Sequence, residues 1–133
     1  MTKKELEAAR DIKKELNGLE EWLNHLRTTG GVNSSISSDT VAKSRKTMEA
    51  IQTAAETEEK IKELRHQLEI EQEIIWRWLK KASLSKRERE LMRLFYVECR
   101  TMSNVAAGVG YSVTNAKKMK AKILEKLIPS DTL

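Results

Sequence analysis

The chain has 133 residues and a formal net charge of +5, with 34% charged residues, 5% aromatic residues, five glycines and one proline. This composition favours long, exposed helices over a β-rich fold, and no apolar run approaches the roughly 20 residues that cross a bilayer. A single cysteine, Cys99, excludes an internal disulfide and fits a reducing cytoplasm.

The charge is unevenly distributed along the chain. Residues 1–83 carry 15 basic and 15 acidic side chains, whereas residues 84–127 carry ten basic and four acidic ones. A neutral and a basic segment suggest two roles, and the basic one indicates a polyanionic partner. We therefore predict an all-α protein with a helical oligomerisation region over 1–83, a basic domain over 84–128 and a short tail over 129–133.

The first predicted helix runs from about Thr2 to Arg27. Its apolar residues recur at intervals of three and four, as in a coiled-coil seam. Gly30 and Gly31 then stop the helix, and the serine-rich run that follows predicts a flexible linker over about 28–40. The oligomerisation residues predicted on this helix are Leu16, Leu19, Leu23 and Leu26.

A second helix is predicted from a cap at Asp39 or Thr40 to about Ala82, with a strong heptad pattern only from Ile61 onward. A simple antiparallel hairpin would set the first helix against the weaker half and leave the stronger half without a partner in the chain. An exposed apolar seam predicts association with a second copy, although a longer linker would let the first helix slide along instead. The oligomerisation residues predicted on this helix are Ile61, Leu64, Leu68, Ile75 and Trp78.

Three short helices are predicted in the basic segment. Ser85 followed by Glu88 forms a capping-box pattern, and Thr101 can cap the next helix. Gly110 and then Ser112 mark the turn into the last helix, because glycine accepts positive φ and serine is a favoured cap. Ala106 is small enough for two helices to cross closely, and Tyr111 is expected to plug the core. This spacing predicts a helix-turn-helix with a three-helix core.

The residues at the beginning of the last helix are predicted to point outward. From there Val113 and Thr114 can touch thymine methyl groups and a lysine can donate to guanine, while Lys120 and Lys122 are expected to hold phosphates. These contact residues are poor in Arg and include no Gln. We therefore expect modest discrimination between DNA sequences over a strong, salt-dependent background of non-specific binding. The DNA-binding residues predicted are Ser85, Thr101, Ser112, Val113, Thr114, Asn115, Lys117, Lys118, Lys120 and Lys122.

The stretch LSKRERELMRLFYVECRTMSNVAAGVGYSVTNAKKMKAKILEKL resembles region four of bacterial sigma factors. Joined to a long helical half, it resembles phage-encoded transcriptional regulators of the ArpU and RinA kind. The resemblance implies late-gene regulation in a phage or prophage, duplex DNA as partner, the cytoplasm of a bacterial host cell, and contact with RNA polymerase. Three positions depart from the pattern: Cys99-Arg100 replaces a usual glycine, Asn104 replaces an acidic or amide cap, and Gly108 lies inside a short helix.

Two other functions remain open. One is a phage packaging component that forms rings and grips DNA without regulating it, and the other is an adaptor that binds only protein. No catalytic motif or phosphate loop is present in the sequence, and His25 and His66 are isolated, so we expect no enzyme activity, cofactor or metal site. A gel-shift titration and the stoichiometry of the particle separate these functions.

Overall fold

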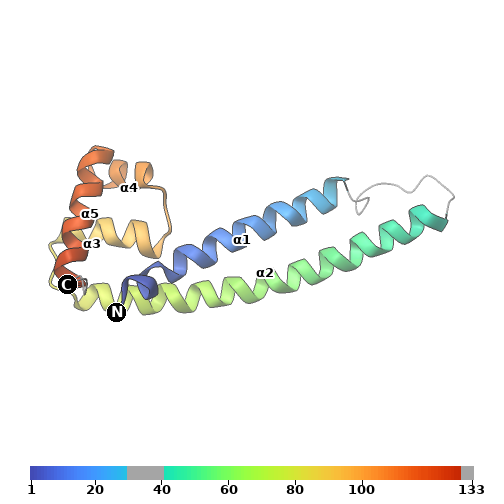
Figure 1. Ribbon diagram of the computed structural model, residues 1–133, viewed down its shortest axis with the longest axis horizontal. Helices are drawn as coiled ribbons and strands as arrows, with labels where there is room; N and C mark the ends of the chain where they lie inside the picture. Colours follow the sequence, from blue (N-terminus) through green and yellow to red (C-terminus); the bar gives the residue numbers. More distant parts are fainter. Residues whose placement is uncertain (30–40, 130–133) are drawn as a thin grey trace. The chain divides into compact units, whose positions relative to one another are not determined.

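The structure, a computed structural model, describes residues 1–29 and 41–129, with side chains for 1–28 and 48–129. The described residues form helices and no strand, which confirms the all-α prediction (Figure 1). The predicted caps Asp39 and Thr40 and almost all of the predicted linker lie outside the described residues. The helices are α1 (Lys3–Thr29), α2 (Val41–Lys81), α3 (Lys86–Met92), the π-helix η1 (Arg93–Val97), α4 (Met102–Val109) and α5 (Val113–Leu127).

The chain divides into two compact units that do not follow the boundary in charge. The terminal unit contains residues 1–13 and 68–133, and the central unit contains residues 14–67. The first turns of α1 and the last turns of α2 therefore belong with α3–α5. This grouping is invisible in the linear sequence, where residues 1–13 lie far from the basic segment.

In the central unit, α1 and α2 run antiparallel. Arg65 Nη2 lies 3.1 Å from Glu20 Oε1, and Arg27 pairs with Glu58. In two antiparallel helices, the numbers of facing residues always add up to the same value. Both ion pairs fit one such value, so they define the register. Near these pairs lie apolar side chains of the two helices that are at most 8% exposed. They are Leu16, Leu23, Leu26, Ile61 and Leu64.

This register corrects the argument from which a dimer was predicted. We expected the seam beginning at Ile61 to lack a partner within the chain, and that expectation is wrong. Because Arg27 faces Glu58, α1 lies along the strong half of α2, as in the alternative of a sliding first helix. Leu68 and Ile75 are buried too, in the terminal unit, while Leu19 and Trp78 are half-buried. The seam is therefore satisfied inside one chain.

The predicted helix caps of the terminal unit are confirmed. Ser85 Oγ accepts from the Glu88 N–H at 3.2 Å, and the Glu88 carboxylate accepts from the Ser85 N–H at 2.8 Å. The second of these bonds lowers the pKa of Glu88, because it favours the charged carboxylate. Thr101 caps α4 and Ser112 caps α5, each accepting from the backbone N–H three residues later. Each helix therefore begins where its own sequence predicts.

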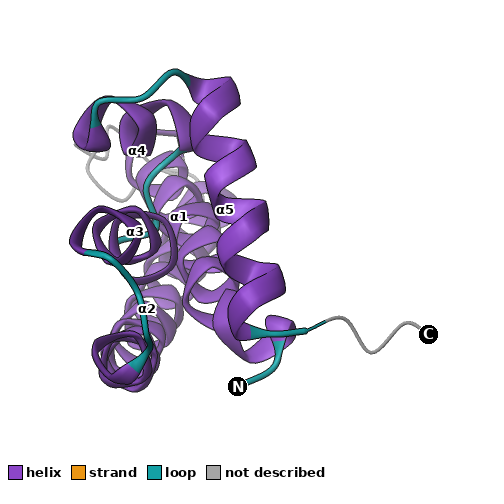
Figure 2. Ribbon diagram, turned by 90° about the vertical axis from the view of Figure 1, so that its left-hand side faces the viewer, coloured by secondary structure: helices purple, strands orange, loops and turns teal. Residues whose placement is uncertain are grey.

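Helices α3, α4 and α5 pack around a common core (Figure 2). Ala106 is 2% exposed, as its small size at the crossing predicts. Gly108 has a packing role that was not predicted, since a Cβ added there would lie 2.9 Å from Leu94 Cδ1. The close approach of α4 to η1 therefore favours a glycine at 108, because a larger residue would push the Leu94 side chain aside. The other buried core side chains are Leu91, Met92, Leu94, Phe95, Tyr96, Val105, Val109, Ala116 and Ile123.

The end of η1 takes an unusual shape where the sequence lacks the expected glycine. Cys99 adopts φ 56°, a left-handed conformation that costs a side-chain-bearing residue energy. Long side chains from other helices satisfy the carbonyls of this turn: Arg10 donates to Phe95 O at 2.9 Å and to Arg100 O at 2.8 Å, and Gln72 donates to Val97 O at 2.7 Å. Residues of α1 and α2 thus complete the turn.

Candidate nucleic-acid interface

The corner between α4 and α5 is built on Gly110. This residue has φ 77°, and its N–H bonds back to the carbonyls of Ala106 and Ala107, while the N–H of Tyr111 donates to Ala106 O at 2.9 Å. A side chain at 110 would meet nothing within 4 Å, so the left-handed backbone alone favours glycine there. Two distinct helices result, with α5 beginning directly after the turn.

The beginning of α5 presents its predicted contact residues to solvent. Ala116 and Ile123 are buried against α3 and α4, which turns the opposite side of the helix outward. Val113 is 37% exposed, a notable fraction for an apolar residue at this position. The other exposed members of the predicted set on this helix are Ser112, Thr114, Asn115, Lys117, Lys118 and Lys122.

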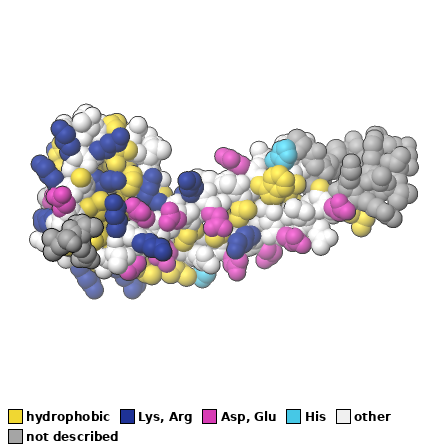
Figure 3. Space-filling view, viewed as in Figure 1, with side chains coloured by type: hydrophobic (Ala, Val, Ile, Leu, Met, Phe, Trp, Pro, Cys, Tyr) yellow, Lys and Arg dark blue, Asp and Glu magenta, His cyan; other side chains and the backbone are white. Residues whose placement is uncertain are grey.

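The lysines of this face lack carboxylate partners. Three nearby acids are engaged elsewhere: Glu88 caps α3, Glu90 pairs with Arg93, and Glu98 pairs with both Arg93 and Arg100. The bond from Arg93 lowers the pKa of Glu90. Within residues 1–29 and 41–129, no ion pair joins Lys117, Lys118 or Lys122 to an acid. Figure 3 shows Lys and Arg side chains gathered over the part of the surface that carries α3–α5.

Lys120 lies differently from its predicted place among the phosphate-binding lysines. It is half-buried, with Nζ 4.3 Å from the centroid of the Phe95 ring and 6.0 Å from that of Tyr96. Burial lowers the pKa of Lys120, and the positive charges of Arg10 and Lys3 lower it further. The side chain covers the aromatic core because position 120 falls on the flank of α5 that faces Phe95.

Tyr111 and Arg87 form a contact that the sequence analysis missed. Tyr111 was expected to plug the core, but it is only half-buried. Arg87 Nη1 donates to its hydroxyl at 3.2 Å, and the guanidinium lies 5.2 Å from the ring centroid. This holds a cation of α3 beside the turn that precedes α5. Ser85 and Thr101 are also exposed on this unit, each engaged as a helix cap.

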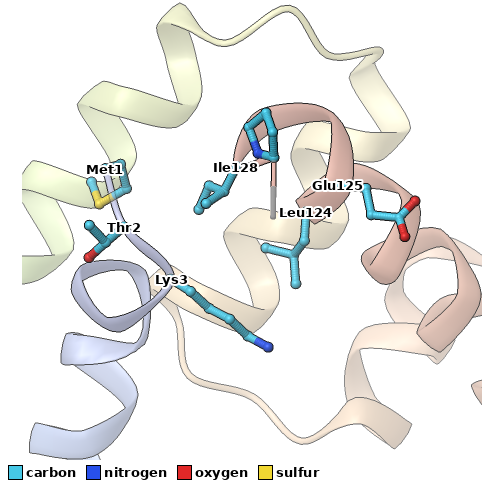
Figure 4. Close-up of a pocket in the computed structure, with 7 residues that line it drawn as sticks. Met1, Thr2, Lys3, Leu124, Glu125 and Ile128 are labelled. Atoms are coloured by element: carbon cyan, nitrogen blue, oxygen red, sulfur yellow. The ribbon is translucent and has the colours of Figure 1, made fainter. Parts of the chain in front are cut away.

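Two surface pockets flank these helices, and neither contains a recognisable catalytic group. One of about 470 Å³ is lined by Lys86, Arg87, Glu90, Gly108 and Val109. The other, of about 440 Å³, lies between the first turn of α1 and the end of α5 (Figure 4). In the described part of the chain no three His, Cys, Asp or Glu side chains group as metal ligands would. The chemistry on offer at this surface is that of exposed cations.

No protein-family profile, curated protein or solved structure matches the chain. The resemblance to sigma region four therefore has no support beyond the residues that carry it. None of the described helices combines the length and apolarity needed to cross a membrane. What indicates a function is the geometry of the terminal unit, namely the turn at Gly110 and the exposed lysines of α5.

Proposed function

We propose that the protein is a sequence-specific, DNA-binding transcriptional regulator of a phage or prophage, in which α4 and α5 act as a helix-turn-helix. One observation carries the proposal. The turn at Gly110 separates α4 from α5, and the exposed face of α5 bears Lys117, Lys118 and Lys122, none of which pairs with a carboxylate among the described side chains. Exposed cations along one face of a helix fit a polyanion, and a major groove of roughly 12 Å admits one helix.

The roles of the side chains follow from their places along α5. Val113 and Thr114 begin the helix and carry methyl groups suited to thymine, while Lys117 is positioned to donate to guanine. Lys118 and Lys122 lie further around and along the helix, where phosphates of the groove wall would meet them. The exposed face of α5 has lysines but no Arg or Gln among these residues. Lysines give affinity more readily than specificity, so the discrimination between sequences is modest.

The proposed regulator is a dimer, but its two copies are not held together by the predicted seam. Helix-turn-helix proteins commonly read two half-sites one helical turn apart, which requires two copies. The seam residues that were predicted to join the two copies are largely buried inside one chain. A different part of the surface must therefore form the dimer contact. Contact with RNA polymerase remains an implication of the sigma resemblance, and no described residue carries it.

The alternative is a DNA-binding packaging or assembly component with ring-like stoichiometry. The same uncompensated lysines support it, because gripping phosphates requires no base contact. Particle mass distinguishes the two functions, since a regulator would be dimeric and a packaging ring larger. Sequence preference distinguishes them as well, since a packaging component would bind all duplexes equally.

A gel-shift titration at several salt concentrations tests the proposal. We expect a steep salt dependence with tighter binding to a selected duplex than to a random one. Lys117→Glu combined with Lys118→Glu should abolish binding while leaving helicity and particle mass unchanged, because both side chains are exposed. A control is Lys60→Glu with Lys62→Glu, the same charge change on exposed residues of the central unit; because these lysines pair with Glu63 and Glu59, its helicity is measured as well. Binding that survives the first pair, or is lost with the second, contradicts the proposed interface.

A further inference from the structure

The terminal unit gathers positive charge from both ends of the chain. It contains 17 basic and 11 acidic side chains, whereas the central unit contains eight and nine. Four of the basic side chains come from residues 1–13, a segment that the linear charge count assigns to the neutral half. The fold therefore adds cations of α1 to the surface of α5.

Arg10 fixes the first turns of α1 against η1. Its two hydrogen bonds reach the carbonyls of Phe95 and Arg100, 85 and 90 residues away, and its guanidinium stacks 3.8 Å from the Phe95 centroid. Leu6 and Ala9 are fully buried on the same helix. The beginning of α1 is consequently held in place rather than resting loosely on the surface.

Lys3 lies beside one flank of α5. That flank carries Lys117, Lys120 and Leu124, which share a helix face because they are three and four residues apart. Lys3 lines a pocket together with Leu124, and its side chain extends from α1 toward α5 (Figure 4). It is also close enough to Lys120 to lower the pKa of that ammonium group.

The cations of this flank are poorly balanced. Lys3, Arg10 and Lys117 all oppose the charged form of Lys120, Glu7 favours it, and Glu125 lines the pocket that Lys3 shares with Leu124. Lys3 itself is exposed and forms no ion pair with any side chain described. Fixed like charges repel one another, and a bound phosphate would relieve that repulsion.

We infer that the DNA-contacting surface extends from α5 onto the first turn of α1, where Lys3, beside the end of α5, binds a phosphate of the duplex. This inference rests on the proposed function and names a part of the interface that lies outside the predicted 84–128 domain. The contact is to the sugar–phosphate backbone, so it strengthens binding to every duplex alike.

Lys3→Gln and Lys4→Gln form a matched pair for the test, because both residues are exposed on the first turn of α1 and each substitution removes one charge. The full-length chain is titrated with a short random-sequence duplex over a range of salt concentrations. Losing one phosphate contact should weaken binding about two- to fivefold and reduce the slope of log K against log salt by about 0.9. We expect this for Lys3→Gln, near-unchanged values for Lys4→Gln, and retention of binding by Lys3→Arg.

The outcomes separate this inference from the function on which it rests. If the unsubstituted chain binds no duplex, the proposed function fails and the inference fails with it. If the chain binds, but the two glutamine variants behave alike, α1 contributes only general charge and the inference is wrong. If Lys3→Arg also loses the affinity and slope, the effect is structural rather than a phosphate contact, and the inference is again wrong.

Discussion

Tyr96 shows how one buried hydroxyl affects stability. The residue is 0% exposed, and its hydroxyl has no hydrogen-bond partner in the part of the chain that the structure describes. An unpaired buried polar group costs roughly 1–3 kcal/mol. Tyr96→Phe removes that group and keeps the ring, so we expect the free energy of unfolding to stay level or rise by about 1 kcal/mol. Urea denaturation measures it, and a marked loss of stability would reveal a partner for the hydroxyl.

The same residue predicts a pH dependence. Burial, and then the negative charge of Glu7, raises the pKa of Tyr96 from 10.0 to about 12. Because the folded pKa lies above the unfolded one, stability is unaffected below pH 10 and falls as the pH rises toward 12. The unfolding free energies of the unsubstituted chain and of Tyr96→Phe should therefore diverge over this window. Parallel curves would show that Tyr96 ionises as freely in the folded state as in the unfolded one.

Gly108 and Gly18 both lie in helices, and they predict opposite effects of alanine. Nothing lies within 4 Å of a Cβ added at Gly18, so Gly18→Ala should gain up to about 1 kcal/mol of helix propensity. At Gly108 the added Cβ meets Leu94, which is 4% exposed and packed in the core. We expect Gly108→Ala to lose about 1 kcal/mol, because overpacking outweighs propensity. Thermal unfolding of both variants tests this, and equal stabilisation would show that the α4 crossing has room.

At the scale of helices, the features predicted correctly are local. The caps at Ser85, Thr101 and Ser112 depend on residues three positions apart, and the left-handed turn depends on Gly110 itself. Such features are determined by chemistry within one helical turn, so a single sequence is enough to predict them. The exposed face of α5 follows from the same local pattern.

The features that the sequence did not reveal depend on distant residues. The α1–α2 register is visible in pairs such as Arg27 with Glu58, which lie 31 residues apart, and many registers satisfy a repeat of three and four equally well. The capping of η1 by Arg10 joins residues 85 and 90 positions apart, which no local pattern signals. The contact of Lys120 with Phe95 was not predicted for the same reason, since Phe95 lies 25 residues earlier. The departure noted in the sequence at Cys99-Arg100, where a glycine is usual, coincides with the positive φ that Cys99 adopts.

At the scale of the whole chain, the basic segment is not self-contained. The carbonyls at the end of η1 are satisfied by Arg10 of α1 and Gln72 of α2, and Leu6, Ile75 and Leu79 are fully buried in the same unit. A fragment limited to residues 84–128 would lose these donors and this apolar cover. Without α1 and α2 these carbonyls would face water, so the larger loss is the apolar cover. Burying one Leu- or Ile-sized side chain contributes about 1.5–3 kcal/mol, a large share of the 5–15 kcal/mol that stabilises an ordinary domain.

We therefore expect the 84–128 fragment to unfold at a markedly lower temperature than the full chain, or to lack a cooperative transition. Circular dichroism during heating measures this. Adding residues 68–83 restores Gln72, Ile75 and Leu79 but not Arg10, so this longer fragment should recover only part of the stability. If 84–128 alone melts as cooperatively as the full chain and at the same temperature, the contacts from α1 and α2 do not stabilise the fold. The extension of the DNA interface onto α1 would then lack the rigid attachment that Arg10 is inferred to provide.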